Sequence, residues 1–262
     1  MTVVAVANQK GGVAKTATAV SVGAVLAQEG KRVLLIDIDP QANATSALGG
    51  SRASEPSIYS VLVEEGPIIH AITHTAVERL DLIPSAEAMA GAEIELVPVL
   101  ARELRLRSAI TALRGYDLVL IDCPPSLGLL TINALVASDA VVVPVQSEYL
   151  ALEGLAQLTR TIDAVRSRLN PRLEIAAILL TMHDSRNRLA SDVADELKRH
   201  FPQLLSATRI PRTVRLAEAP SHGQPITVYA PGSSAAAAYA DFAHELLARL
   251  ASRDLAPAQV AS

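Results

Sequence analysis

The stretch Lys10-Gly-Gly-Val-Ala-Lys-Thr16 follows an apolar run at residues 3–7 and precedes a helical pattern that begins near Lys15. This order predicts a strand, a glycine-rich turn and a helix, which together bring unpaired backbone N–H groups and the positive helix end to one point. Such a point favours a bound phosphate. Because Gly11 and Gly12 allow the backbone to approach an anion closely, the stretch predicts a phosphate-binding loop.

The loop departs from the usual phosphate-binding pattern, which ends in Gly-Lys-Ser/Thr and carries another glycine five residues earlier. Here Ala14 precedes Lys15, and Gln9 occupies the place of the first glycine. Ala14 keeps its N–H group, so the cradle survives if its backbone angles suit a Cβ. We expect Lys15 to contact the outer phosphates and the Thr16 hydroxyl to bind Mg2+. A second cation, Lys10, stands at the mouth of the loop.

Two further apolar runs end in carboxylates. One run ends with Asp37 and Asp39, and another ends with Asp122. The carboxyl ends of parallel strands line the ligand crevice, so these groups are expected beside the loop. Either Asp37 or Asp39 could hold a water on Mg2+ or orient the attacking water, and Asp122 could hold the Mg2+ shell opposite Thr16. A turn-forming Asp-Pro cap would explain one aspartate at the first strand end better than two. The segment 124–128 could act as a γ-phosphate-sensing switch.

Apolar runs rich in β-branched residues alternate with helical patterns along the chain. Both faces of the runs are apolar, which is typical of buried parallel strands. We expect strands at 3–7, 32–38, 80–84, 117–121, 140–145 and 173–181, with weaker candidates at 204–210 and 225–228. We expect helices at 15–28, 87–113, 127–137, 153–169, 189–200 and 235–250, and the main loops at 40–56 and 209–223. The alternation predicts an α/β fold, a mainly parallel twisted sheet with helices on both faces.

Length and composition suit a single large domain. Half of the 262 residues are hydrophobic and the mean hydropathy is +0.30, which is enough for a substantial core. We expect residues 1–252 to form one domain and residues 253–262 to be a disordered tail. No signal peptide and no apolar stretch of roughly 18–20 residues is visible, so a cytoplasmic protein is expected.

Composition also narrows the possible ligands. Aromatic residues make up only 3% of the chain, which argues against base stacking on an aromatic platform. The net charge of −4 argues against a uniformly basic nucleic-acid binder. The one cysteine, Cys123, excludes an internal disulfide and argues against a cysteine-rich metal site. We expect Cys123 to be a packing residue at a strand end.

Several motifs resemble a known family. The loop at 10–16, the strand end at 37–46 and Asp122-Cys-Pro-Pro-Ser-Leu-Gly128 resemble the deviant Walker ATPases. Three later stretches narrow the resemblance to the chromosome- and plasmid-partitioning ParA/Soj proteins. These are Val143-Pro-Val-Gln-Ser-Glu-Tyr-Leu-Ala-Leu-Glu-Gly154, Thr181-Met-His-Asp-Ser-Arg186 and Ile210-Pro-Arg-Thr-Val-Arg-Leu-Ala-Glu-Ala-Pro-Ser-His-Gly223. The resemblance runs from about residue 3 to residue 250. It implies that the α/β fold is that of a P-loop NTPase and that residues 1–252 form a single P-loop ATPase domain.

This resemblance implies a nucleotide-dependent cycle. ATP binding with Mg2+ would drive a sandwich homodimer in which the nucleotides lie between the two subunits. Lys10 would be the signature lysine that reaches the partner subunit's phosphates, like an arginine finger supplied in trans. The dimer would bind double-stranded DNA without sequence preference and would associate with the nucleoid. A ParB-type protein would stimulate hydrolysis, which is expected to be slow without partner and DNA.

The resemblance also carries roles to individual positions. The phosphate cradle would comprise Gly11, Gly12, Val13, Ala14, Lys15, Thr16 and Ala17, with Lys10 added from the partner. The catalytic residues would be Asp39, Lys10 and Lys15, and the Mg2+ site would be formed by Thr16, Asp37, Asp39 and Asp122. Pro211 would border the adenine. The chain departs from the family where Ala14 and Ala42 replace the usual glycines and where Ala17 replaces the usual threonine, which removes a hydroxyl that could touch the α-phosphate.

Charge is distributed unevenly along the chain. Between residues 160 and 220 there are eleven Lys/Arg residues and seven Asp/Glu residues, an excess of four positive charges. The rest of the chain has an excess of eight negative charges. Such a segment fits contact with DNA phosphates, although ordinary solvated helix faces also carry such charge. The expected DNA contacts, in loops or at helix starts, are Arg186, Arg188, Arg212 and Arg215.

Three alternatives share part of this pattern. A MinD-like membrane-associated positioning ATPase would need a basic amphipathic C-terminal helix, whereas the pattern at 235–250 is rich in alanine and Pro257 interrupts the tail. A reductase of the nitrogenase iron-protein type would need two cluster cysteines. A DNA-binding module without hydrolysis is disfavoured by the intact Lys15, Thr16, Asp39 and Asp122.

Overall fold

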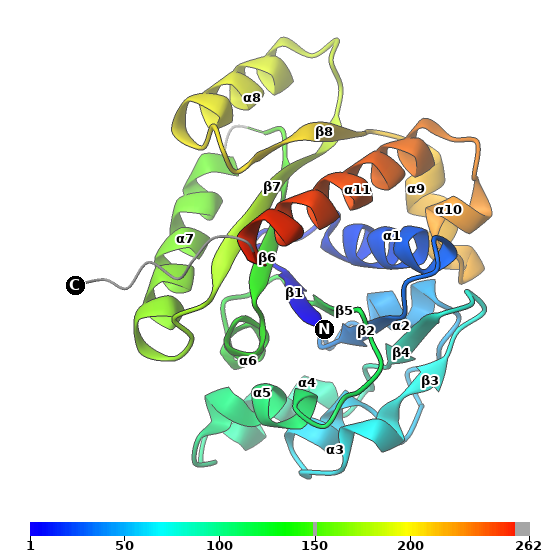
Figure 1. Ribbon diagram of the computed structural model, residues 1–262, viewed down its shortest axis with the longest axis vertical. Helices are drawn as coiled ribbons and strands as arrows, with labels where there is room; N and C mark the ends of the chain where they lie inside the picture. Colours follow the sequence, from blue (N-terminus) through cyan, green and yellow to red (C-terminus); the bar gives the residue numbers. More distant parts are fainter. Residues whose placement is uncertain (149–150, 255–262) are drawn as a thin grey trace.

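The computed structural model describes residues 1–148 and 151–254 and contains an eight-stranded sheet in those residues (Figure 1). The strand order is β3-β4-β2-β5-β1-β6-β7-β8. All pairings are parallel except the one between β3 and β4. The strands are β1 Thr2–Val6, β2 Val33–Asp37, β3 Thr73–His74, β4 Leu80–Ile83, β5 Leu118–Asp122, β6 Ala140–Gln146, β7 Glu174–His183 and β8 Leu205–Pro211. The predicted α/β class with a mainly parallel sheet is confirmed.

Helices cover both faces of the sheet (Figure 1). On one face, the buried cluster includes residues of α1 Lys15–Gln28, α2 Asn43–Ala47, α9 Val214–Glu218, η3 Ala219–His222, α10 Ile226–Tyr229 and α11 Ser234–Asp254. On the other, it includes residues of α3 Ile58–Leu62, η1 Ile68–Ala71, α4 Met89–Leu96, α5 Arg105–Ile110, α6 Leu129–Ala137, α7 Ala151–Arg168 and α8 Arg188–His200. The short η2, Arg102–Leu104, precedes α5.

Neighbouring residues of each strand face opposite sides, which explains the continuous apolar runs. Val4 and Val6 of β1 join the α1 and α11 side, whereas Val3 and Ala5 join the α6 and α7 side. All four are buried. Each fully buried aliphatic side chain contributes about 1.5–3 kcal/mol relative to an exposed one, so a strand enclosed on both sides is stabilised along its whole length.

The predicted helix at 87–113 is wrong as a single element. Helix α4 ends at Leu96, and α5 begins only at Arg105. Between them, Pro98 lacks a backbone donor and Ala101 takes a left-handed φ of 52°. Periodicity of the apolar residues continues through this break because both pieces pack on the same side of the sheet.

The C-terminal expectations also need correction. Residues 225–228 were expected to favour a strand, but the structure has helix α10, in which the amides of Val228 and Tyr229 donate to the carbonyl of Pro225. The expected loop at 209–223 contains the end of β8, helix α9 and η3, and the loop at 40–56 contains α2. Helix α11 continues to Asp254, past the expected boundary at residue 252. The rest of the predicted disordered tail, 255–262, lies outside the described residues.

Ala14 is the residue at which the turn after β1 becomes helix α1. Its φ of 65° and ψ of 33° are left-handed, and no side chain caps the helix there. Ala42, the other departure from a family glycine, has φ 53° and ψ 38° at the start of α2. Left-handed backbone costs roughly 1–2 kcal/mol for a residue with a Cβ. Both helices beside the predicted phosphate site therefore begin from a strained alanine.

Substituting Ala14 with glycine should stabilise the protein. We expect Ala14→Gly to raise the free energy of unfolding by about 0.5–1 kcal/mol, because the relieved strain exceeds the backbone freedom that glycine adds to the unfolded chain. The matched control is Ala248→Gly, on an exposed site inside α11, which should lower it by about 1 kcal/mol. Denaturant unfolding measures both, and changes of the same sign would contradict the strain at Ala14.

Candidate functional site

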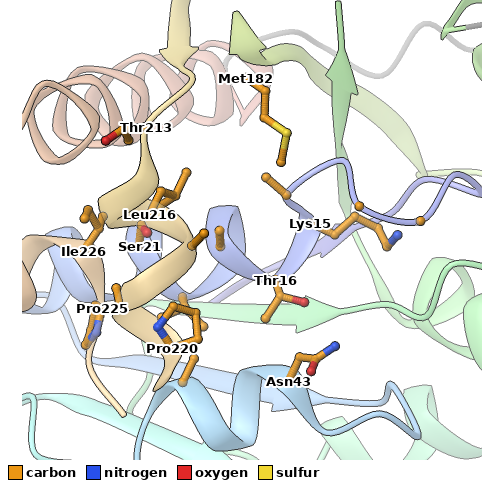
Figure 2. Close-up of a pocket in the computed structure, with 18 of the residues that line it drawn as sticks. Lys15, Thr16, Ser21, Asn43, Met182, Thr213, Leu216, Pro220, Pro225 and Ile226 are labelled. Carbon is orange, nitrogen blue, oxygen red and sulfur yellow. The ribbon is translucent and has the colours of Figure 1, made fainter. Parts of the chain in front are cut away.

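A cavity of about 550 Å³ opens at the carboxyl edge of the sheet, between the loop after β1 and the segment that follows β8 (Figure 2). This volume is in the range of small-molecule sites. At one end, the lining residues include Gly11, Gly12, Lys15, Thr16 and Asp39. At the other end, the lining is mainly apolar and includes Leu216, Pro220, Pro225 and Ile226 (Figure 2). The cavity therefore suits a ligand with an anionic end and a flat apolar end.

Strand register brings the acidic residues together. Asp122 of β5 is paired with Val6 on one side and with Asp37 on the other. All three therefore stand at the same level of the carboxyl edge, and Asp39 follows two residues after Asp37. The predicted juxtaposition of these aspartates with the loop is confirmed.

Lys15 lies at the start of α1 with only 6% of its surface exposed. Its Nζ donates to the backbone carbonyl of Lys10 at 3.0 Å, which bends the loop around the ammonium group. Burial lowers the pKa of Lys15, while nearby Asp122, Cys123 and Asp39 act in the opposite direction. An ammonium group has three donors, so donors remain for an anion in the cavity.

Thr16 and Asp122 form the contact that a metal would use. The Thr16 hydroxyl donates to Oδ2 of Asp122 at 2.8 Å. The other oxygen of that buried carboxyl, Oδ1, has no hydrogen-bond partner in the described residues. Burial raises the pKa of Asp122, and the neighbouring Asp37 adds to the rise. A buried carboxylate oxygen without a donor is a suitable acceptor for a hydrated cation.

Asp37 and Asp39 have different surroundings. Asp37 is fully buried, and its carboxylate accepts hydrogen bonds from the Thr45 amide and hydroxyl at 2.7 Å each and from the Asp39 amide at 3.1 Å. Burial raises the pKa of Asp37 to about 6, partly offset by the Thr45 bonds. Asp39 instead lines the cavity, and its Oδ1 accepts from the Gln41 amide at 2.9 Å. Asp37 thus orders the turn, whereas Asp39 faces the ligand space.

The described residues contain no group of three or more His, Cys, Asp or Glu side chains arranged around one metal position. Mg2+ commonly keeps several waters and takes one or two protein carboxylates together with substrate phosphates. The donor set of Thr16 and the unpartnered oxygen of Asp122 fits that mode of binding.

Lys10 does not line this cavity. Its Nζ forms an ion pair with Oε2 of Glu148 at 2.5 Å, and its amide donates to Oδ1 of Asn8. Strand β1, which precedes Lys10, is adjacent to β6, which precedes Glu148. Although Glu148 belongs to a quoted motif, sequence reasoning gave it no role, because its proximity to Lys10 depends on strand adjacency across 138 residues.

Other expected site residues are placed as follows. Ala14, Ala17 and Pro211 line the cavity. Val13 is buried, and its carbonyl accepts from the Thr181 hydroxyl at 3.0 Å. Cys123 is fully buried, as expected for a packing residue. The sequence did not indicate Met182 or Asn43, which also line the cavity (Figure 2).

The four arginines expected to contact DNA lie after strands β7 and β8. Arg186 donates from Nε and Nη2 to Asp184, at 2.9 Å each, and this pairing lowers the pKa of Asp184 to about 2. Arg188 begins α8, Arg215 lies on α9, and Arg212 lines the cavity. No carboxylate among the described residues forms a salt bridge with Arg188, Arg212 or Arg215.

Known proteins resemble this chain along most of its length. A family model described as an AAA domain matches residues 1–175. The sporulation initiation inhibitor protein Soj of Bacillus subtilis is 55% identical over 248 residues, covering 94% of this chain and 98% of Soj. The chromosome partitioning protein ParA of Caulobacter vibrioides is 49% identical over 251 residues, 94% of each chain.

A crystal structure described as cobyrinic acid a,c-diamide synthase from Mycobacterium smegmatis, with bound ADP and magnesium, shares the fold. Its TM-score is 0.84 at 41% identity, with 96% of each chain covered. The sheet order, the loop at the edge of β1 and the aspartates beside it agree with these similarities. The chain therefore belongs to the ParA/Soj family of chromosome-partitioning P-loop ATPases.

Proposed function

We propose that this chain is an ATP hydrolase for DNA segregation, in which ATP binding drives a homodimer that binds DNA without sequence preference. The observation that carries the proposal is the arrangement of the two loop lysines. Lys15 is buried at the end of the cavity that suits an anion. Lys10 lies outside the cavity with 35% of its side chain exposed, and it forms an ion pair with Glu148. A cation placed at the mouth of the loop is available to a second subunit.

ATP with Mg2+ fits the two ends of the cavity. The loop amides and Lys15 would hold the phosphates, while Pro211 and the apolar residues around it would enclose the adenine. Thr16 and Asp122 would hold Mg2+, with Asp37 ordering the adjacent turn. When bound, Mg2+ neutralises charge on the outer phosphates and fixes their orientation. The ADP and magnesium in the M. smegmatis neighbour support this assignment.

Asp39 is the residue proposed to orient the attacking water. Its carboxylate faces the cavity, and the hydrogen bond from the Gln41 amide holds it in place. The Ser85 hydroxyl, which donates to the Asp39 carbonyl at 2.7 Å, fixes the backbone of the same turn. Lys15 and the partner subunit's signature lysine would stabilise the charge that develops on the transferred phosphoryl group.

Dimerisation would couple ATP to DNA binding. Each subunit contributes a shallow surface with Arg186, Arg188, Arg212 and Arg215, and two such surfaces bind more tightly than one. Binding through phosphates is sensitive to salt and indifferent to sequence. A ParB-type protein would stimulate hydrolysis, which is slow in its absence, and would release the dimer from the nucleoid.

A MinD-like membrane role is the alternative, and the packing of α11 disfavours it. Tyr239, Phe242 and Leu246 of this helix are fully buried against the sheet, so its apolar face is already covered. As a separate finding, none of the helices in the described residues is long and apolar enough to cross a bilayer. The close relatives named for chromosome partitioning favour the DNA role.

Replacing the signature lysine should separate nucleotide binding from dimerisation. We expect Lys10→Ala to abolish the ATP-dependent dimer, measured by light scattering with ATP and Mg2+, while the monomer still binds nucleotide through Lys15 and the loop amides. The matched control is Glu148→Gln, which removes the ion pair that holds Lys10 within its own subunit. It should keep the dimer, with at most a few-fold change in the association constant, since exposed ion pairs contribute about 0.2–1 kcal/mol. An ATP dimer in Lys10→Ala would refute the trans role.

Replacing Asp39 should stop the cycle in its DNA-bound state. We expect Asp39→Ala to bind ATP and DNA but not to hydrolyse ATP, because the water loses its orienting carboxylate. Phosphate release is measured for the protein alone, with double-stranded DNA, and with DNA and the ParB-type protein together. Hydrolysis by the unsubstituted chain should rise along this series, whereas the variant stays flat. Normal turnover in Asp39→Ala would assign the catalytic role elsewhere, and a chain that never binds DNA with ATP would contradict the proposed function.

A further inference from the structure

His183 and Arg209 form a contact that the nucleotide site does not use. Arg209 Nη1 lies 3.1 Å from Nε2 of His183, and Nδ1 of the same ring lies 3.2 Å from the Ser147 hydroxyl. A guanidinium group can only donate hydrogen bonds, so Nε2 of His183 is the acceptor and Nδ1 carries the proton toward Ser147. The imidazole is therefore neutral, and it joins the ends of β6 and β7 to the edge strand β8.

Two charged side chains near the His183 ring affect its pKa. Burial lowers the pKa of His183, and Arg209, which faces the ring from β8, lowers it further, while Asp184 after β7 acts in the opposite direction. The carboxylate of Asp184 is itself occupied by Arg186. From the β6 side the ring meets the uncharged Ser147. Only 9% of His183 is exposed, so the ring is a fixed acceptor rather than a surface group.

Arg209 is exposed, and the contact with His183 leaves most of its donors free. No salt bridge to Arg209 occurs among residues 1–148 and 151–254. Its neighbours Thr208 and Ile210 face the α11 side, where Thr208 binds Glu245 and Ile210 is buried. Since side chains alternate along a strand, Arg209 emerges on the opposite side of β8. The result is an oriented cation whose charge is not neutralised by any carboxylate in the part of the chain that the structure describes.

The surrounding charge favours a polyanion at this place. Arg209 stands two residues before the end of β8, and Arg212 and Arg215 follow it directly along the chain. Residues 55–117 carry ten acidic residues against five basic residues, and they form β3, β4 and the helices α3, α4 and α5 at the opposite end of the molecule (Figure 1). The balance of charge therefore favours a polyanion at the β8 end over the other end.

We propose that Arg209 is an additional contact to DNA phosphates and that the neutral ring of His183 is its positioning residue. This inference rests on the proposed DNA-binding function and adds to it a residue that sequence reasoning did not select. The hydrogen bond from Arg209 to His183 orients the planar guanidinium before DNA binds. The Arg209 side chain therefore loses less conformational entropy on binding. A charged residue that only protects an edge strand from pairing would look similar, but it would not affect DNA affinity.

The test measures binding of a short double-stranded DNA by fluorescence anisotropy, with ATP and Mg2+, at several salt concentrations. Arg209→Ala should weaken binding on the order of tenfold and should reduce the salt slope by about one per contact, hence by about two for a dimer. Arg209→Lys should keep the slope but bind less tightly, because lysine lacks the planar fork. Arg79→Ala, near the start of β4 in the acidic half, is the matched control and should bind as the unsubstituted chain does.

Variants of His183 separate positioning from charge. His183→Leu should weaken DNA binding several-fold with the salt slope unchanged, since Arg209 keeps its charge but loses its acceptor. His183→Gln should restore binding, because its side-chain carbonyl can accept the same N–H group. ATP-dependent dimerisation and hydrolysis without DNA should stay normal in these variants. Unchanged affinity and slope in Arg209→Ala would overturn the contact, and unchanged affinity in His183→Leu would overturn the positioning role. Failure of the unsubstituted chain to bind DNA with ATP would instead contradict the proposed function itself.

Discussion

The site depends on the parallel pairing of β5 with β1 and β2. Asp122 is paired with Val6 in one register and with Asp37 in the other, so the loop after β1 and both acidic strand ends meet at one level. A register shift of one residue would turn Asp122 to the other face and would break its bond with Thr16. Burial of both sheet faces makes such a shift costly, and the core therefore fixes the geometry of the site.

The charges of the buried side chains at the carboxyl edge of the sheet balance only in part. Asp37 and Asp122 are fully buried with raised pKa values, and the buried Lys15 is the cation closest to them in the loop. The unpartnered oxygen of Asp122 and the remaining donors of Lys15 suit a magnesium–nucleotide complex. Lys10 lies outside the cavity and forms an ion pair with Glu148, and we propose that it contacts the nucleotide of a second subunit. That assignment would account for the second lysine of the loop.

The sequence predicted correctly those helices and strands whose apolar pattern and flanking turn residues indicate the same bounds. Helix α1 begins at Lys15 and ends at Gln28, as expected, because the glycine turn and the apolar pattern both point to it. The break between Leu96 and Arg105 was missed because the apolar periodicity continues through it, although Pro98 is a helix-breaking signal in the sequence; the left-handed Ala101 is not. Thr227 and Val228 favour a strand by type, yet α10 forms because Pro225 begins a turn of helix there. The aspartates beside the loop could be predicted because they lie at the ends of apolar strand patterns. The positions of Met182 and Glu148 and the His183–Arg209 contact depend on which strands are neighbours in the sheet, and the sequence does not show this.

The claim that each nucleotide site needs a lysine from the other subunit can be tested by mixing two inactive proteins. In a mixed dimer of Lys10→Ala and Asp39→Ala subunits, the first subunit keeps Asp39 and receives Lys10 from the second, so one complete site is formed. ATP hydrolysis is measured for each variant and for their equimolar mixture, with DNA and the ParB-type protein present. We expect the mixture to hydrolyse ATP while neither variant does so alone. A mixture as inactive as its components would contradict it.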